Sequence, residues 1–405
     1  MANIAYTIWC ENLNSSIIRS QVYDVLIEKQ KLSPRDNINL IAFQPFYKMF
    51  SQKEKIKNST LKLKKSNISL IQIPCFKIPK LGLSPGKWFV LPFVFLQSFP
   101  ILLFFKIIKN ISIFHCRSYP ITLAPIAIKK FTSVKVVFDP RSNFPEEQLK
   151  PGKEELSYKV WKFIENIYLN NADITISITS TYTDHFKKTT YGTKFIEIPN
   201  NVDVNKFKPD SVIKKQQRDQ LNIGENEIIF CYSGSLNNSW NNPDTYAKFI
   251  IELRSLKIKH RFLFITLNTG QLINSFNIYG IKEDEYFLVS CDLDEMPQYL
   301  AIADFGINIM EKKDIRMSIK SAEYLSMGLP IITNSNVLGV KEIIEKHNTG
   351  LVINKLNLKE INDLILSRER LSISCREIAC NFFSTEKVAK DYSSIYKSFN
   401  INYRI

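Results

Sequence analysis

The sequence predicts an α/β protein with two doubly wound parallel-sheet domains that face a cleft. Apolar, β-branched stretches alternate with stretches of helical periodicity from residue 3 to residue 203, and the alternation begins again at residue 226. This pattern favours parallel strands that are covered by helices on both faces of the sheet. The length of 405 residues also suits two separate hydrophobic cores.

The individual elements follow from the same periodicity. Strands are expected where β-branched residues cluster, at residues 3–10, 37–43, 66–75, 110–118, 134–142, 174–180, 226–236, 260–268, 285–291 and 305–310. Helices are expected where apolar residues recur every three or four positions, at residues 16–30, 124–132, 154–173, 245–256 and 294–304. A helix followed by a strand is expected across residues 319–335, and the weakly periodic residues 200–217 are expected to link the domains.

Positive charge is concentrated at the start of the chain. Residues 1–150 contain 22 Lys and Arg against 8 Asp and Glu, which places +14 of the net charge of +15 there. Such an imbalance indicates an anionic partner, such as a membrane surface or an acidic substrate, although a solvated basic face would look the same. The alternative from a different class of function is a nucleic-acid-binding module. We expect no nucleic acid, because the basic stretches lack the motifs of known readers.

The cysteines indicate a reducing compartment. Their odd number of seven and their spacings predict neither a metal site nor a redox motif, and several lie in apolar runs. The N-terminal stretch MANIAYTIWCENLN shows no secretory signal. We therefore expect a cytoplasmic protein, peripheral at the inner face of a membrane.

One segment, Trp88–Ile108, is long and apolar enough to be considered for a membrane span. Pro92, Gln97, Ser98 and Pro100 interrupt it, so we expect it to pack against the rest of its domain. Its basic surroundings leave open an alternative, in which the segment lies on a membrane surface.

Three residues at the start of the helix expected from residue 319 could bind a nucleotide. Ser318 stands where an N-cap is expected, Lys320 lies in the first turn, and Glu323 follows on the same face. A cation is unfavourable at a helix N-terminus, whereas a phosphate is attracted there. A bound diphosphate would resolve that conflict, and Glu323 could accept hydrogen bonds from ribose hydroxyls. The alternative is an ordinary surface Lys–Glu pair.

The stretch YSGSL, residues 232–236, ends a predicted strand with a glycine turn. Gly234 would let the backbone approach a phosphate closely, with neighbouring N–H groups forming an anion nest. Ser235 could add a hydroxyl donor. A simple turn is the alternative.

Four motifs in order resemble those of family 4-type retaining glycosyltransferases with the GT-B fold. The stretch SIKSAEYLSMGLPIITNS, residues 318–335, resembles their nucleotide-sugar site, in which a Lys precedes a Glu-Tyr pair by three residues and Gly-x-Pro follows. EIPNNVDVNKF (197–207) resembles the interdomain signature, and YSGSL resembles the turn that opens the second domain. LDEMPQYLAIADFGI (293–307) resembles the helix and strand before the donor site.

The resemblance implies two Rossmann-like domains, with residues 1–205 on the acceptor side and residues 206–387 binding the donor. It also implies a C-terminal helix, about residues 388–405, that crosses back to the first domain. Transfer would proceed with retention, without a metal and without a cofactor besides the nucleotide-sugar substrate. Backbone contacts to the base are placed at Ser290 and Cys291.

The sequence departs from this family at two places. Many members have a first Glu eight residues before the second, where this chain has Ile315 with Asp314 beside it. Its glycine turn, GSLNNSWNNP, also has no basic residue. We therefore expect Lys320, Arg316 and the helix end to meet the diphosphate charge. A subgroup with a Ser-x-Lys-x-x-Glu-Tyr motif has a similar arrangement, with a Pro that this chain lacks.

Two strand ends of the first domain supply candidate catalytic residues, which are His115, Arg141 and Glu147. The resemblance places a sugar-contacting His near the first strand end, although a lone His is more often structural. Asp139, Arg141 and the later glutamates resemble an Asp-x-Arg pattern of the same subgroup. A guanidinium such as that of Arg141 suits a carboxylate or a phosphate.

The expected function is sugar transfer from a nucleotide-sugar donor to a saccharide or lipid-linked acceptor of a surface glycan, such as capsule or lipopolysaccharide. Two alternatives remain: a nucleotide-sugar epimerase of the same fold, with cleft carboxylates such as Glu146 and Glu147, and a non-catalytic partner subunit. Asp292 and Asp294 are interpreted as helix-capping residues, so that no metal site is expected there.

Overall fold

The chain folds into two compact units, one formed by Met1–Pro199 with Thr385–Ile405 and the other by Asn200–Ser384. The boundaries predicted from the sequence were after residues 205 and 387. The structure is a computed structural model and describes residues 1–76, 87–149, 155–188, 192–236, 241–355 and 357–401. Part of the glycine turn singled out above, residues 237–240, therefore lies outside the described residues.

The first unit is built on a seven-stranded sheet with the order β3-β2-β1-β4-β5-β6-β7, in which every pairing is parallel. The strand order reverses between β1 and β4, which is where doubly wound sheets bind ligands at their carboxyl edge. The strands are β1 (Asn3–Trp9), β2 (Asn37–Pro45), β3 (Ile68–Cys75), β4 (Ile113–Arg117), β5 (Lys135–Asp139), β6 (Ile174–Ser177) and β7 (Lys194–Glu197).

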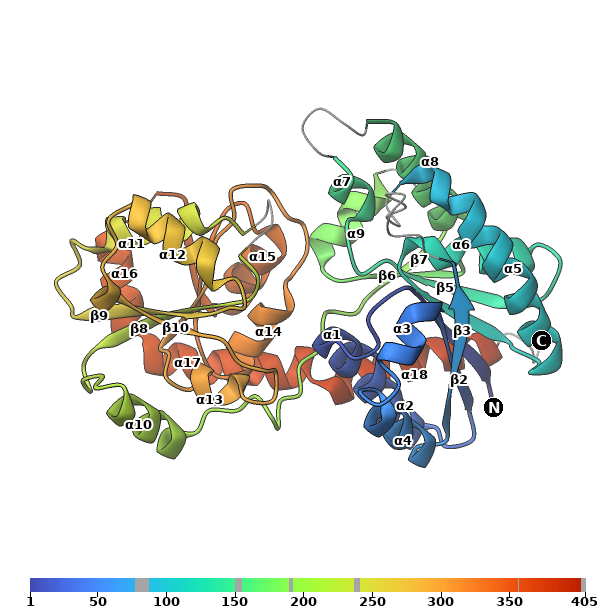
Figure 1. The fold of residues 1–405 in the computed structure, drawn as a ribbon, viewed down its shortest axis with the longest axis horizontal. Coiled ribbons are helices and arrows are strands. Elements are labelled where there is room, and N and C mark those ends of the chain that lie inside the picture. Colours follow the sequence, from blue (N-terminus) through green and yellow to red (C-terminus); the bar gives the residue numbers. More distant parts are fainter. Residues whose placement is uncertain (77–86, 150–154, 189–191, 237–240, 356, 402–405) are drawn as a thin grey trace. The chain divides into compact units, whose positions relative to one another are not determined.

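Helices cover both faces of this sheet (Figure 1). One face packs against α2, α4 and the C-terminal helix α18, and the other against α5, α6 and α8. The helices are α1 (Ser16–Ile18), the π-helix η1 (Arg19–Asp24), α2 (Val25–Leu32), α3 (Phe46–Ser51), α4 (Lys57–Lys65), η3 (Trp88–Val90), α5 (Leu91–Ile108), α6 (Tyr119–Lys129), α7 (Phe144–Glu147), α8 (Glu155–Asn171), α9 (Ser180–Lys187) and α18 (Thr385–Ile401).

The last helix, α18, packs on the first unit although 185 residues of the second unit precede it. Val388, Tyr392, Ile395 and Phe399 form its buried stripe, with the helical spacing expected from the sequence. They share a core with α2 and with alternate residues of β1, since successive strand side chains point to opposite faces.

The second unit contains a six-stranded parallel sheet with the order β10-β9-β8-β11-β12-β13. Its strand order reverses between β8 and β11. The strands are β8 (Ile228–Ser233), β9 (His260–Ile265), β10 (Tyr286–Val289), β11 (Phe305–Asn308), β12 (Ile331–Asn334) and β13 (Gly350–Ile353). Two doubly wound parallel sheets confirm the predicted fold class.

The helices of the second unit include one, α10, in the segment that was predicted to be a linker. Helix α10 lies within the supposed linker because Asp210 accepts hydrogen bonds from the backbone N–H groups of Val212 and Ile213, which caps its first turn. The helices are α10 (Ser211–Gln220), α11 (Pro243–Leu253), α12 (Thr269–Ile278), η4 (Glu283–Glu285), α13 (Met296–Leu300), α14 (Ile319–Ser326), α15 (Leu338–His347), α16 (Leu358–Leu366), α17 (Arg368–Ile378) and η5 (Ala379–Phe383).

Helix α14 is fastened to the sheet by Tyr324. Its buried ring packs on β11 at Gly306, and its hydroxyl accepts a hydrogen bond of 2.7 Å from the backbone N–H of Ser233, the last residue of β8. A Cβ atom at position 306 would overlap the Tyr324 ring. The glycine therefore allows the close helix–strand contact that positions α14.

We expect Gly306→Ala to lower the free energy of unfolding by about 1–3 kcal/mol, because the added methyl group overpacks the contact with Tyr324. The matched control is Gly270→Ala in α12, where an added Cβ meets nothing within 4 Å. Chemical denaturation measures both. Equal stability of the two variants would contradict the assignment of this contact.

Candidate functional site

The start of α14 is held at the carboxyl edge of the second sheet by two asparagines. Asn308, at the end of β11, donates hydrogen bonds of 3.1 Å from Nδ2 to the hydroxyls of Ser318 and Ser321. Asn200 donates a 2.8 Å hydrogen bond to the carbonyl of Met317. The Pro-Asn of the interdomain signature thus fixes the residue that precedes the helix.

Ser318 occupies the N-cap position of α14, but its hydroxyl does not cap the helix as we expected. The Ser318 hydroxyl instead accepts a hydrogen bond from Asn308 and lies 3.0 Å from the Ser321 hydroxyl. The N–H groups of the first turn therefore have no side-chain cap. Uncapped N–H groups at a helix N-terminus suit a bound anion.

Lys320 points from the first turn of α14 toward the end of β8. Its Nζ lies 4.1 Å from the centre of the Tyr232 ring and 3.8 Å from the position that a Cβ of residue 234 would occupy. Gly234 has a φ of 130°, which is strained for any residue with a side chain. The structure therefore brings Lys320 and Gly234 together, two residues that were each predicted to contact a phosphate.

Lys320 is half-buried with its ammonium over the Tyr232 ring, Glu323 is buried, and neither has a partner of opposite charge among the described residues. Neither side chain makes a hydrogen bond or an ion pair with any residue that the structure describes. Burial lowers the pKa of the Lys320 ammonium to about 7, although Glu323 and Asp314 oppose the shift. Burial likewise raises the pKa of the Glu323 carboxyl to about 7, against Lys206 and Lys320. Two uncompensated groups at a switch point are poised for a polar ligand.

Arg316 is already paired, contrary to the expectation that it is available for phosphate. Its Nε and Nη2 each lie 2.9 Å from the two carboxylate oxygens of Asp314. Asp314 is itself held in a backbone bridge to Val337. The pair forms a structural clamp on the loop before α14 and leaves Lys320 as the cation of this helix end.

The remaining predicted donor residues lie at strand ends of the same edge. The exposed Ser235 donates a 2.9 Å hydrogen bond to Asn268 just after β8. Ser290 follows β10 and donates to the carbonyl of Thr266 at 2.7 Å, with the half-buried Cys291 beside it. Strand β9 separates β10 from β8, so these contacts would be made to a different part of a ligand than those of Lys320.

His115 is buried inside the first unit and does not lie at an open edge. Its Nδ1 lies 2.8 Å from the Tyr396 hydroxyl, its Nε2 lies 3.1 Å from Asp139, and the Tyr6 ring stacks on it. Burial lowers the pKa of His115, although Asp139 opposes the shift. An imidazole with no exposed surface cannot touch a sugar unless these tyrosines move, so its predicted sugar contact gains no support.

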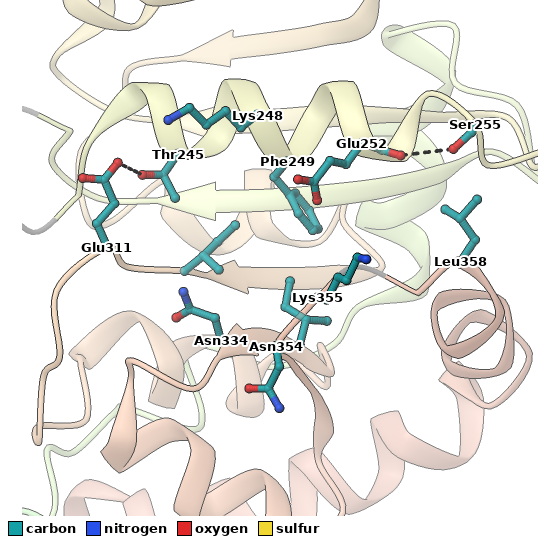
Figure 2. Close-up of a pocket in the computed structure, with 12 residues that line it drawn as sticks. Thr245, Lys248, Phe249, Glu252, Ser255, Glu311, Asn334, Asn354, Lys355 and Leu358 are labelled. Carbon is teal, nitrogen blue, oxygen red and sulfur yellow. Dashed lines mark hydrogen bonds between the residues drawn. The ribbon is translucent and has the colours of Figure 1, made fainter.

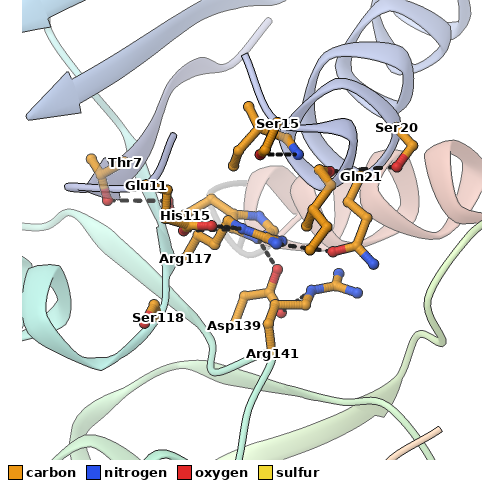
Figure 3. Close-up of polar contacts among 12 residues, drawn as sticks. Thr7, Glu11, Ser15, Ser20, Gln21, His115, Arg117, Ser118, Asp139 and Arg141 are labelled. Atoms are coloured by element: carbon orange, nitrogen blue, oxygen red, sulfur yellow. Dashed lines mark hydrogen bonds and ion pairs between the residues drawn. The ribbon is translucent and has the colours of Figure 1, made fainter. Parts of the chain in front are cut away.

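Arg141 and Arg117 anchor two ion pairs at the carboxyl edge of the first sheet (Figure 3). Arg141 lies 2.6 Å from Asp139 and donates to the Tyr392 hydroxyl, while Arg117 pairs with Glu11 at 3.2 Å. Burial alone would raise the pKa of Asp139, but Arg141 and His115 hold it well below its ordinary value.

Backbone strain marks the same edge of the first sheet. Ser118 and Arg141, the residues that leave β4 and β5, have φ angles of 73° and 54°. Such angles cost of the order of 1–3 kcal/mol for residues with a side chain, and they concentrate at functional sites. Glu147 is the last residue of α7 and follows Glu146, whose carboxylate pairs with Lys162 at 2.7 Å.

The residues that hold the site residues in place were not predicted from the sequence. Tyr392 was expected only as a core position of the C-terminal helix, Tyr396 was not singled out, and Tyr324 was only part of a motif. Glu11 and Gln21, which bind Arg117, were not noticed. The only available signal was that Glu11 follows the first strand directly, at the edge where ligands bind.

A separate cavity of about 720 Å³ opens between α11 and the carboxyl ends of β11, β12 and β13 (Figure 2). Thr245, Glu311, Asn334 and Lys355 are among the residues that line it, and none of the predicted site residues does.

Asp292 and Asp294 do not cap α13, whose N-cap residue is Glu295; Asp294 pairs with Lys206 instead. Among the described residues no cluster of three His, Cys, Asp or Glu side chains could hold a metal.

We expect Tyr392→Phe to lower the free energy of unfolding by about 1.5–3 kcal/mol, the range for hydrogen bonds to charged groups. The hydroxyl accepts from Arg141 at 2.6 Å and donates to Asp139 at 3.2 Å, and its loss leaves both charges less well satisfied. Urea denaturation measures the loss. Ser394→Ala, at an exposed position of the same helix, is the control, and equal midpoints would contradict the prediction.

We expect Glu323→Gln to raise the free energy of unfolding by roughly 3 kcal/mol at pH 8, since one pKa unit corresponds to about 1.4 kcal/mol. The folded-state pKa of about 7 lies above the ordinary 4.5, so ionisation in the folded protein is unfavourable. The gain should shrink as the pH falls from 7 toward 4.5 and vanish below 4.5, where the wild-type carboxyl is protonated in both states. Denaturation from pH 5 to pH 8 tests this, with the exposed Glu283→Gln as control. A gain that does not change with pH would refute the burial argument.

Comparisons with known proteins agree with the geometry of this second unit. Residues 227–367 match the family described as Glycosyl transferases group 1. No curated protein sequence matches the chain.

Solved structures resemble the chain over almost its whole length. Sucrose-phosphate synthase from Thermosynechococcus elongatus has a TM-score of 0.72 at 12% identity, with 99% of this chain and all of that chain covered. HepE from Anabaena, solved with UDP, has a TM-score of 0.68 at 13% identity over 98% and 100% of the two chains. WaaG, a glycosyltransferase involved in lipopolysaccharide biosynthesis, has a TM-score of 0.64 at 13% identity over 97% and 99%. Residues 227–367 thus resemble the glycosyl transferases group 1 family, and the chain as a whole has the GT-B fold of these solved structures.

Proposed function

We propose that the protein transfers a sugar from a nucleoside-diphosphate donor to a saccharide or lipid-linked acceptor of a surface glycan. The observation that carries this proposal is the pair of uncompensated groups, Lys320 and Glu323, on the uncapped N-terminal turns of α14 beside Gly234. A nucleotide diphosphate supplies the complement of both groups, an anion for Lys320 and hydroxyl donors for Glu323.

The two residues would have separate tasks. Lys320 and the N–H groups of α14 would bind the diphosphate and stabilise the negative charge that develops as the sugar–phosphate bond breaks. Glu323 would accept hydrogen bonds from the ribose hydroxyls and so set the register of the nucleotide. Ser290 and Cys291 would face the base from the end of β10, and Ser235 would add a donor at the end of β8.

Structures with the same fold support a nucleotide-sugar donor. HepE was solved with UDP, with UDP and glucose, and with UDP-glucose. WaaG is involved in lipopolysaccharide biosynthesis, which supports a surface glycan as the acceptor of the present protein. We propose retention of configuration and no metal, since Lys320 supplies a positive charge where the phosphate would lie.

In the first unit we propose that His115 and Arg141 are positioning residues. The hydrogen bonds of His115 and the ion pair of Arg141 hold Asp139 at the carboxyl edge of the sheet, next to the strained turn. Glu147, at the end of α7 on the same edge, would be the carboxylate closest to the acceptor side.

We expect Lys320→Ala and Glu323→Gln each to reduce sugar transfer by about 100-fold or more while the fold is retained, the scale for loss of one group that stabilises transition-state charge. Glu323→Gln should weaken binding of the nucleoside diphosphate by about 1–3 kcal/mol, the scale for a charge-assisted hydrogen bond. Calorimetry with UDP, GDP, ADP and CMP and a transfer assay with the corresponding donors measure both effects. The exposed Lys313→Ala, on the loop before α14, is the control. Wild-type turnover in either site variant would reject the assignment.

The pH dependence gives a second test of the same residue. Because the pKa of Lys320 is about 7, a growing fraction of the unliganded protein carries a neutral amine above that pH. A diphosphate binds the charged form better, so the affinity advantage of wild type over Lys320→Ala should fall as the pH rises from 7 to 9. An advantage that is constant over this range would contradict a direct contact with phosphate.

Conversion of the donor sugar without any acceptor product would favour an epimerase, and nucleotide binding without turnover would favour a non-catalytic subunit.

A further inference from the structure

Helix α5 buries only one narrow face. Its buried residues, Leu91, Val94, Ser98 and Leu102, recur at helical spacing and form a single stripe. Helix α6 packs alongside α5 on the sheet (Figure 1). The Trp88–Ile108 segment is the one described helix long and apolar enough to cross a membrane by length and composition, and 22% of its apolar window is buried.

The opposite face of α5 is apolar and open to solvent. Phe93, Leu96, Pro100, Phe104 and Ile107 recur every three or four residues, so they lie along one side of the helix for four turns. Leu96 and Ile107 are each 69% exposed, and Phe93 and Phe104 are 59% and 57% exposed. A contiguous apolar surface of this kind marks an interaction site. We call these five residues the α5 ridge.

The buried stripe argues against a span across the bilayer. A spanning α5 would have to leave α6, exposing the core that Leu91, Val94 and Leu102 complete. The helix is also tied to the end of β3, because the side-chain oxygen of Gln97 accepts a 2.8 Å hydrogen bond from the backbone N–H of Phe76. The helix can therefore present its ridge while it stays in the domain.

The charge around the ridge identifies the kind of partner. The sequence has no Asp or Glu between Glu54 and Asp139, whereas it has 14 Lys and Arg in that interval. Lys106 and Lys109 lie at the end of α5, and Lys130 follows the end of α6, where the neighbouring Lys129 is already paired with Asp173 at 2.8 Å. A second copy of the chain would bring two strongly positive surfaces together, which is unfavourable. Anionic lipid offers both negative headgroups and an apolar interior.

We propose that the α5 ridge, together with Lys106, Lys109 and Lys130, docks the protein on an anionic lipid bilayer, with α5 in the plane of the interface. The ridge side chains enter the headgroup–acyl boundary, and the lysines contact the negatively charged headgroups. Docking does not depend on the transfer chemistry, so its failure would leave the proposed function untouched.

Flotation of the full-length protein with vesicles tests the proposal. We expect binding to phosphatidylcholine vesicles that contain phosphatidylglycerol, with at least tenfold weaker binding to phosphatidylcholine alone and marked loss in high salt. The ridge variant Phe93→Ser/Phe104→Ser/Ile107→Ser should bind at least tenfold less. Lys106→Glu/Lys109→Glu should lose most of the preference for anionic vesicles.

Two controls match these variants. Ile278→Ser/Leu366→Ser replaces exposed apolar residues of the second unit, and Lys320→Ala removes the proposed donor site; both should bind vesicles as wild type does. The far-ultraviolet circular dichroism of the ridge variant should be unchanged, because its altered side chains are exposed. Wild-type binding by the ridge variant, equal binding to neutral and anionic vesicles, or resistance of bound protein to alkaline carbonate would overturn the proposal. A lipid-independent dimer that the ridge substitutions abolish would overturn it in favour of a second copy.

Discussion

The contact between Tyr324 and the end of β8 is the constraint on which the candidate donor site depends. The Tyr324 hydroxyl accepts from the backbone N–H of Ser233, and its ring fits against Gly306. Lys320 and Glu323 lie on the same helix, so this one contact fixes both relative to Gly234. Asn308 and Asn200 hold the start of the helix and occupy the Ser318 hydroxyl and the Met317 carbonyl. The first turn is thereby rigid but left without a side-chain cap.

The two units treat their buried charges in opposite ways. At the switch point of the first sheet, Arg117 and Arg141 have the carboxylate partners Glu11 and Asp139, which reduces the cost of burying them. At the switch point of the second sheet, Lys320 and Glu323 have none among the described residues. The second arrangement costs stability, and a large aromatic and aliphatic core offsets that cost. An incoming nucleotide would find its partners already desolvated, which strengthens each interaction.

Helix α18 makes the first unit depend on the last residues of the chain. Its Tyr392 and Tyr396 hydroxyls complete the hydrogen bonds of Arg141, Asp139 and His115, and its apolar stripe completes the core under β1. Because α18 follows the second unit in the chain, the first unit can reach its final packing only after the second unit has been synthesised. Helix α5, by contrast, is packed on one side alone and leaves an apolar ridge in water.

The sequence by itself determined the two parallel sheets, because alternation of β-branched strands with amphipathic helices has few other solutions. It also identified Gly234 and Lys320 as candidate phosphate contacts, because one lies in a glycine turn after a strand and the other at the start of a helix. Tertiary structure alone decided which charges are satisfied. Arg316 has the right spacing for a phosphate but is taken by Asp314, and His115 ends a strand but is covered by tyrosines from a distant helix. Pairing and burial depend on side chains that are remote in sequence, and no local pattern records them.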